Sequence, residues 1–156
     1  NKNVKPWYQH IKKNDIPTID EDNDVSIKVL VGKVKNTSSA VQTYSPVSIF
    51  DVQFTKPSLI DLDIPKNQKV MVYVIDGELK FHEDNQKAKK GQMIYFDQSS
   101  DMINLTSISP IGSYLVLAGE PINESVVRYG PFVTNTERDM KQAMLNYQNG
   151  KMGTLI

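Results

Sequence analysis

The sequence predicts an all-β fold, either an antiparallel sandwich or a barrel, that ends in one α-helix. From residue 25 onward, short runs rich in β-branched and aromatic residues follow one another. Gly, Pro, Asn and Asp residues separate these runs at intervals of roughly 8–12 residues, a spacing typical of antiparallel sheets and not of alternating strands and helices. Only one segment, near the C-terminus, has apolar residues at helical spacing.

Residues 1–24 are expected to form an N-terminal arm or interdomain linker. This segment is polar, contains Pro6 and Pro17, and ends in the acidic run of residues 20–24. Proline and a cluster of like charges both disfavour a buried strand, so we expect an arm followed by a loop. Trp7 and Tyr8 are expected to anchor it.

Residues 25–135 are expected to form the barrel. The predicted strands cover residues 25–34, 47–54, 59–64, 70–75, 78–82, 92–96, 103–108, 113–117 and 126–129. The turns between them contain the residues that such turns need, for example Asp76-Gly77 and Gly91.

Residues 136–150 are expected to form the C-terminal helix. Thr136 can cap it, with Asp139 at the third helical position, and Gly150 can end it in the left-handed conformation. The apolar stripe, expected to cover an edge of the barrel or a neighbour, comprises Met140, Ala143, Met144 and Tyr147.

Composition excludes several classes of function. The 156 residues include 18 basic and 18 acidic side chains, so no net charge exists to attract nucleic acid or an anionic membrane. No apolar stretch approaches the ~20 residues that span a bilayer. The absence of cysteine excludes disulfides, zinc fingers, iron–sulfur clusters and thiol catalysis, and it fits the reducing cytoplasm, where we expect the protein.

Motif tests predict no catalytic residue and no metal ligand. The acidic run of residues 20–24 fails as a calcium loop, because Val25 and Val31 stand where the turn Gly and the bidentate Glu are required. No glycine-rich phosphate loop is present. His10 lies in the arm and His82 at a hairpin tip, so we expect both to face solvent.

The segments of residues 70–77 and 91–97 resemble the pair of motifs that characterises cupins, small jelly-roll-like double-stranded β-helix barrels. Metal-binding cupins read G-x5-H-x-H-x3–4-E-x6-G and then G-x5-P-x-G-x2-H-x3-N. Counting back from Gly77 places the Glu position on Val70 and the two His positions on Ile64 and Lys66, or one residue earlier. Counting on from Gly91 places the third His position on Met102. None of the expected ligands is present, and the aliphatic replacements are expected to fill the barrel interior.

The C-terminal third resembles the end of pirin-like proteins. The matching motifs are AGEP at residues 118–121, GPFVTNT at residues 130–136 and the closing helix; the PWYQHI arm at residues 6–11 and the Ser45-Pro46 turn are also similar. The resemblance spans residues 4–153. It implies the second barrel of a tandem cupin, whose N-terminal barrel, absent from this chain, holds an iron-type metal with three His and one Glu.

Two functional interpretations follow from this resemblance. In the first, the chain is a metal-free, non-catalytic cupin domain that serves as the structural or partner-interaction half of a bicupin, or as part of a co-regulator. Its partners would be the N-terminal cupin domain, other proteins or a second copy. In the second, it is part of a metal-dependent quercetin 2,3-dioxygenase whose active site lies in the other barrel; catalysis by this chain alone is not expected.

A third hypothesis, from the residues themselves, is an apolar ligand pocket inside the barrel. Its lining would be Tyr44, Tyr73, Tyr95 and Phe96. Packing of these rings into an ordinary core is the alternative.

Overall fold

The computed structural model describes residues 4–5, 7–21, 24–81, 86–97 and 101–153. It confirms a mostly β chain with one α-helix. The chain divides into two compact units, residues 1–121 and 122–156. Among the described residues, no helix is both long and apolar enough to cross a membrane.

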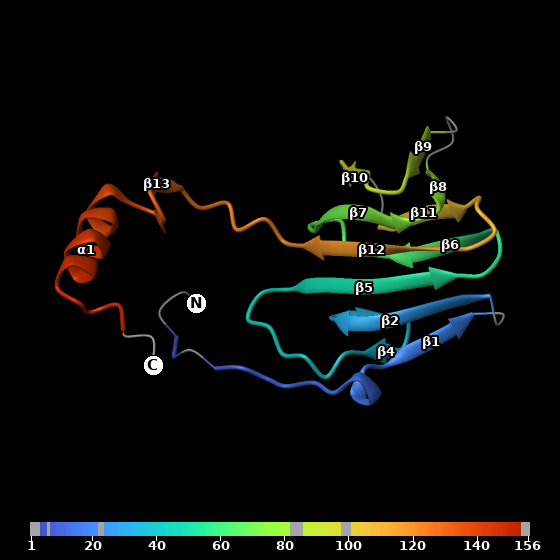
Figure 1. Ribbon diagram of the computed structural model, residues 1–156, viewed down its shortest axis with the longest axis horizontal. Helices are drawn as coiled ribbons and strands as arrows, with labels where there is room; N and C mark the ends of the chain where they lie inside the picture. The colour runs from blue at the N-terminus through green and yellow to red at the C-terminus, as the bar shows by residue number, and fades with distance from the viewer. Residues whose placement is uncertain (1–3, 6, 22–23, 82–85, 98–100, 154–156) are drawn as a thin grey trace. The chain divides into compact units, whose positions relative to one another are not determined.

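The first unit contains two antiparallel sheets (Figure 1). The six-stranded sheet has the order β1 (Thr18–Glu21), β2 (Val25–Val31), β5 (Val47–Phe54), β12 (Gly112–Gly119), β7 (Lys69–Asp76) and β10 (Met93–Phe96). The four-stranded sheet has the order β6 (Ser58–Asp63), β11 (Met102–Ser107), β8 (Glu78–Phe81) and β9 (Gln86–Lys89). A short 3-10 helix (Lys13–Asp15) precedes β1, and a small hairpin joins β3 (Lys33–Val34) to β4 (Thr37–Ser38).

The core of the first unit lies between the two sheets. Successive side chains of a strand point to opposite faces, so every second residue is buried, as in β5 and β12. Phe50, Val52 and Val116 from the large sheet and Leu62 and Leu105 from the small sheet belong to one apolar cluster. The alternation that predicted the strands is therefore the pattern that builds the core.

Several strands differ from the sequence prediction. β1 lies inside the expected arm, and β9 was not expected; both are polar edge strands held by backbone hydrogen bonds to β2 and β8. The predicted strand at residues 25–34 is interrupted at Gly32, which has φ +85°. This left-handed backbone turns the chain into the small β3–β4 hairpin, and only glycine fits there, because a Cβ would lie 2.6 Å from the carbonyl oxygen of Val47.

The second unit is a hairpin of β13 (Val127–Tyr129) and β14 (Phe132–Thr134) followed by α1 (Glu137–Gln148). The division after Pro121 differs from the sequence prediction, which grouped residues 122–135 with the barrel. The reason is that β13 and β14 pair with each other and pack against α1.

The helix ends are as predicted. The Asp139 backbone N–H donates to Thr136 Oγ1 (3.1 Å), and Gly150 has φ +67°. The Gly150 and Lys151 backbone N–H groups donate to carbonyl oxygens of the last helical turn, forming a Schellman motif. Of the apolar stripe, Met140 is buried, and the rings of Phe132 and Tyr147 meet edge to face with centroids 5.7 Å apart.

Candidate functional site

The positions that correspond to cupin metal ligands lie at β6, β7 and β11. Ile64 follows β6 and Val70 lies in β7; both are buried in the apolar core. Neither side chain carries a donor atom, and an aliphatic side chain at an interior position packs against its neighbours instead of binding an ion. These two positions therefore do not fit the metal that the fold family implies.

The other two positions do not face the interior. Lys66 is exposed, and its Nζ lies 3.4 Å from Asp101 Oδ2. The Lys66 backbone N–H also donates to Asp101 Oδ1 (2.9 Å), and the Ile64 N–H donates to the Asp101 carbonyl oxygen (2.9 Å). Met102 is 47% exposed, so the expectation that it fills the barrel interior is wrong. Asp101 thus joins the start of β11 to the turn that leaves β6.

No group of three or more His, Cys, Asp or Glu side chains able to hold a metal occurs in the described part of the chain. His10 is exposed on the arm, as expected. His82 lies outside the described residues.

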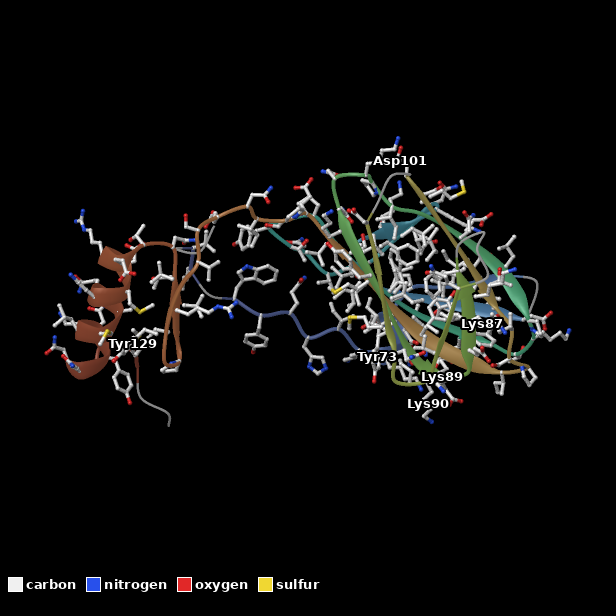
Figure 2. All side chains as sticks on the ribbon, turned by 90° about the horizontal axis from the view of Figure 1, so that it is seen from above. Tyr73, Lys87, Lys89, Lys90, Asp101 and Tyr129 are labelled. Carbon is white, nitrogen blue, oxygen red and sulfur yellow. The ribbon has the colours of Figure 1, made fainter. Side chains whose placement is uncertain are left out.

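The aromatic residues of the hypothetical interior pocket are not brought together inside the barrel. Tyr73 and Tyr95 alternate with the buried residues of β7 and β10, and they point outward with 38% and 59% exposure. Tyr73 is labelled in Figure 2. Tyr44 is exposed and accepts a hydrogen bond from Trp7 Nε1 (3.1 Å), which ties the arm to the loop before β5. Phe96 alone packs against the core, with its ring 6.1 Å from that of Phe81.

Two buried polar atoms have no hydrogen-bond partner among the described residues, and the sequence analysis did not identify either. They are Gln68 Oε1 and the Tyr114 hydroxyl. Burial among apolar side chains raises the pKa of Tyr114 well above its usual value, and the nearby Glu21 carboxylate raises it further. Tyr114 therefore stays neutral at physiological pH and is unsuited to act as a base.

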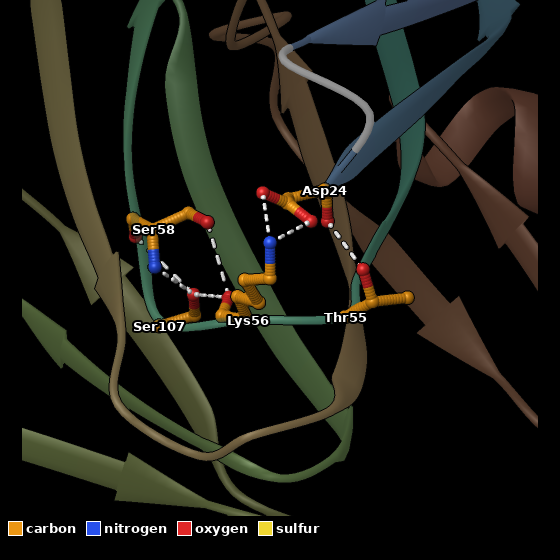
Figure 3. A network of polar contacts seen from close by, with 5 residues as sticks. All are labelled: Asp24, Thr55, Lys56, Ser58 and Ser107. Atoms are coloured by element: carbon orange, nitrogen blue, oxygen red, sulfur yellow. Dashed lines mark hydrogen bonds and ion pairs between the residues drawn. The ribbon is translucent and has the colours of Figure 1, made fainter.

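A network of polar contacts lies where β5 turns into β6 (Figure 3). The Ser58 N–H donates to the buried Ser107 Oγ (2.8 Å), and this hydroxyl lies 3.3 Å from the Lys56 carbonyl oxygen. The Lys56 ammonium pairs with the Asp24 carboxylate (3.1 Å). These groups bind one another and join three segments of chain, which is a structural role.

The exposed ion pair of Lys69 and Asp97 lies beside β10. Lys69 Nζ lies 3.1 Å from Asp97 Oδ1. This hydrogen bond raises the pKa of Lys69, and the neighbouring Tyr95 adds to the effect. The pair is solvent-exposed, so it contributes little to stability.

Comparison with known proteins assigns this chain to a family. Residues 49–153 match the family model described as the pirin C-terminal cupin domain. The chain is 32% identical to rat pirin over 155 residues, covering 97% of this chain and 53% of the rat protein. It is 31% identical to a tomato pirin-like protein over 153 residues, covering 97% and 52% of the two chains.

A solved structure agrees with these matches. The crystal structure of a quercetin 2,3-dioxygenase from Acinetobacter baumannii is similar with a TM-score of 0.84 and 27% identity, over 96% of this chain and 52% of that one. The predicted cupin fold is thereby confirmed. The chain spans about half the length of the relatives it matches.

Proposed function

The chain belongs to the pirin C-terminal cupin domain family, and from this premise we propose that it is the metal-free, non-catalytic half of a two-barrel protein. In this role it acts as a structural and partner-binding domain, and its main partner is a second, N-terminal cupin barrel. The observation that carries the proposal is the replacement of ligand positions by Ile64 and Val70, both buried in the core. An iron-type metal would then be held only in the other barrel.

The first test is metal content and turnover of the purified chain. After incubation with Fe(II) and removal of free metal, we expect far less than one metal per chain and no consumption of quercetin. One tightly held metal per chain together with quercetin consumption would overturn the proposal.

The alternative function is participation in quercetin 2,3-dioxygenation, with the chemistry in the other barrel. The likeness to the A. baumannii quercetin 2,3-dioxygenase favours it. The test uses a fusion protein, in which the half of the A. baumannii enzyme that this chain does not match is joined to this chain. Quercetin consumption by the fusion protein, above that of the A. baumannii half alone, would support the alternative. If the fusion protein and the A. baumannii half alone consume quercetin at equal rates, this chain keeps only the structural role.

The proposal also includes a cytoplasmic location and no direct binding to nucleic acid or membranes. A zero net charge and the absence of cysteine support these points. Cell fractionation followed by immunoblotting tests the location, and the mass of the band shows whether a second domain is attached in the cell.

A further inference from the structure

Asn149 is the one asparagine in this sequence that is followed by a glycine. Every other asparagine precedes a residue that carries a side chain. The backbone nitrogen of the residue after an asparagine can attack the side-chain amide carbon, and a Cβ on that residue hinders the attack. Glycine has no Cβ. The sequence therefore favours this reaction, deamidation, at Asn149 over every other asparagine.

Asn149 caps the C-terminal end of α1, the red helix in Figure 1. Its side chain is exposed, and among the described residues its amide group has no hydrogen-bond partner. Gly150 is exposed as well, and a Cβ built on it would meet no atom within 4 Å. Water therefore reaches both groups that take part in the reaction.

The Schellman motif holds the reacting nitrogen in place. The Gly150 N–H donates to the Tyr147 carbonyl oxygen (3.0 Å), and the Lys151 N–H donates to the Asn146 carbonyl oxygen (2.8 Å). Asn149 has ψ 8°, whereas ring closure requires its Cβ and the Gly150 nitrogen to be eclipsed about the Cα–C bond. Both hydrogen bonds must open before this bond can rotate, so the reaction rate depends on how often the end of α1 opens.

Few buried contacts hold this end of α1 closed. Met140, near the start of the helix, is the only buried hydrophobic residue in the described part of the second unit. Leu145 and Tyr147, near the end, remain 51% and 65% exposed. A helix of 12 residues is marginally stable by itself, and helix ends open more often than helix centres. The Gly150 nitrogen is therefore released frequently.

We propose that Asn149 is a site of spontaneous deamidation and that its product opens the end of α1. In the first step the Gly150 nitrogen bonds to Asn149 Cγ, the Cγ–Nδ2 bond breaks, and Nδ2 leaves as ammonia with the proton that the Gly150 nitrogen has lost. Water then adds to one of the two carbonyl carbons of the resulting succinimide ring and opens it to aspartate or isoaspartate. The net reaction consumes one water and involves no oxidation. This inference does not depend on the proposed function.

The product carries a negative charge at the position where a helix disfavours one. The C-terminal end of a helix is partly negative, because its last carbonyl groups lack partners within the helix. The last turn of α1 contains no basic residue that would offset the new charge. Isoaspartate also adds a carbon to the backbone at the cap, which changes the spacing that the Schellman hydrogen bonds require. Each product therefore weakens the cap, and the hydrolysis is not reversed in water.

The first measurement follows the conversion in the purified chain. The chain is incubated near neutral pH at physiological temperature, and peptide mapping by mass spectrometry measures aspartate and isoaspartate at each asparagine over time. The internal controls are Asn146, in the same helix, and Asn123, which is exposed in the segment before β13. A synthetic peptide of residues 144–153 is too short to form a stable helix and gives the reaction rate without the fold.

We expect Asn149 to react about tenfold faster or more than either control, because only its neighbour lacks a Cβ. The reaction should be slower in the chain than in the peptide, by about the factor by which the fold protects the Gly150 amide from hydrogen exchange. Faster conversion at another asparagine, or conversion of Asn149 in the peptide only, would overturn the assignment of this site.

Two variants test the effect on α1. Asn149→Asp is identical to the aspartate product, whereas Asn149→Gln keeps an uncharged amide that closes a larger ring and therefore reacts slowly. Circular dichroism verifies that both variants fold. The protection of the Gly150 and Lys151 amides from hydrogen exchange should be about two- to fivefold lower in Asn149→Asp than in Asn149→Gln. Incubated wild type should lose protection in the same way, and incubated Asn149→Gln should keep it. Equal protection in the two fresh variants would overturn the effect on α1.

Discussion

At the residue scale, Tyr114 is the buried polar group whose removal should help the fold. Its hydroxyl is buried without a hydrogen-bond partner among the described residues, and such a group costs about 1–3 kcal/mol relative to one that is satisfied. Tyr114→Phe should therefore raise the free energy of unfolding by about 1 kcal/mol, measured by denaturant titration. A lower stability of the variant would indicate that the hydroxyl has a partner in solution.

The same substitution should change the response to alkaline pH. The pKa of Tyr114 is raised in the folded state, so folding favours the protonated hydroxyl over the ionised one, and the free energy of unfolding is independent of this group's titration below the unfolded pKa of about 10. Above that pH the unfolded chain loses the proton while the folded chain keeps it, and the free energy of unfolding falls by about 1.4 kcal/mol per pH unit. The difference in unfolding free energy between wild type and Tyr114→Phe should show this slope above pH 10 and none below it. A pH-independent difference would contradict the raised pKa.

Restoring a carboxylate at the cupin Glu position should damage the barrel. Val70 is buried against the core, so Val70→Glu places an unpaired charge there and should cost about 3 kcal/mol or more. Met102→Gln, at an exposed ligand position, should change stability by less than about 0.5 kcal/mol. Equal unfolding midpoints for the two variants would show that position 70 is not interior.

At the element scale, the two motif glycines can be compared directly. Gly77 and Gly91 have nearly equal φ values, +83° and +82°. A Cβ at Gly91 would meet no atom within 4 Å, whereas at Gly77 it would lie 3.0 Å from the Ile111 carbonyl oxygen and 3.1 Å from Phe54 Cζ. Gly91→Ala should lower the free energy of unfolding by about 1 kcal/mol, because of the backbone conformation alone. Gly77→Ala should lower it by about 1–2 kcal/mol more, because the new Cβ also meets neighbouring atoms. Chemical denaturation measures the free energy of unfolding of both variants. Equal losses would contradict the predicted steric clash at Gly77.

The helix cap can be tested within the second unit. Thr136→Ala removes the acceptor of the Asp139 N–H bond and should destabilise the first turn of α1 by about 1 kcal/mol. Thr136→Ser keeps the hydroxyl and serves as control. Amide hydrogen exchange of the first turn should become faster in the alanine variant only; equal exchange in the two variants would contradict the cap.

Two of the strands that the sequence did not predict share a physical cause. β1 and β9 are polar edge strands whose pairing depends on backbone hydrogen bonds to β2 and β8. Their side chains leave little apolar pattern, since only Ala88 among them is buried. Edge strands of this kind carry charged residues, which in a sequence look like loops.

At the scale of the whole molecule, the balance of charge predicts how the chain behaves in solution. The net charge is zero at pH 7, with an isoelectric point near 6.9, so little electrostatic repulsion opposes contact between chains. Light scattering should give the lowest second virial coefficient near pH 7 and higher values about two pH units away on either side. A value independent of pH would show that charge does not control the association.

The division into two units also belongs to this scale. The barrel has a continuous apolar core, whereas in the described part of the second unit only Met140 is a buried hydrophobic residue. A hairpin and one short helix are marginally stable by themselves. The second unit therefore draws little stability from buried apolar side chains of its own in the part that the structure describes.

The sequence by itself determined the strand-rich fold and the single capped helix, because alternation, turn residues and caps are local patterns. The family followed from the resemblance of the motifs at residues 118–121 and 130–136 to those of pirin-like proteins. The sequence also predicted that Val70 and Ile64 would fill the barrel interior, and both are buried. Only the tertiary structure decided that Tyr73 and Tyr95 face outward, that Met102 is exposed and that Lys66 pairs with Asp101. Alternation separates the two faces of a strand, but cross-strand neighbours far away in the sequence decide which face is buried.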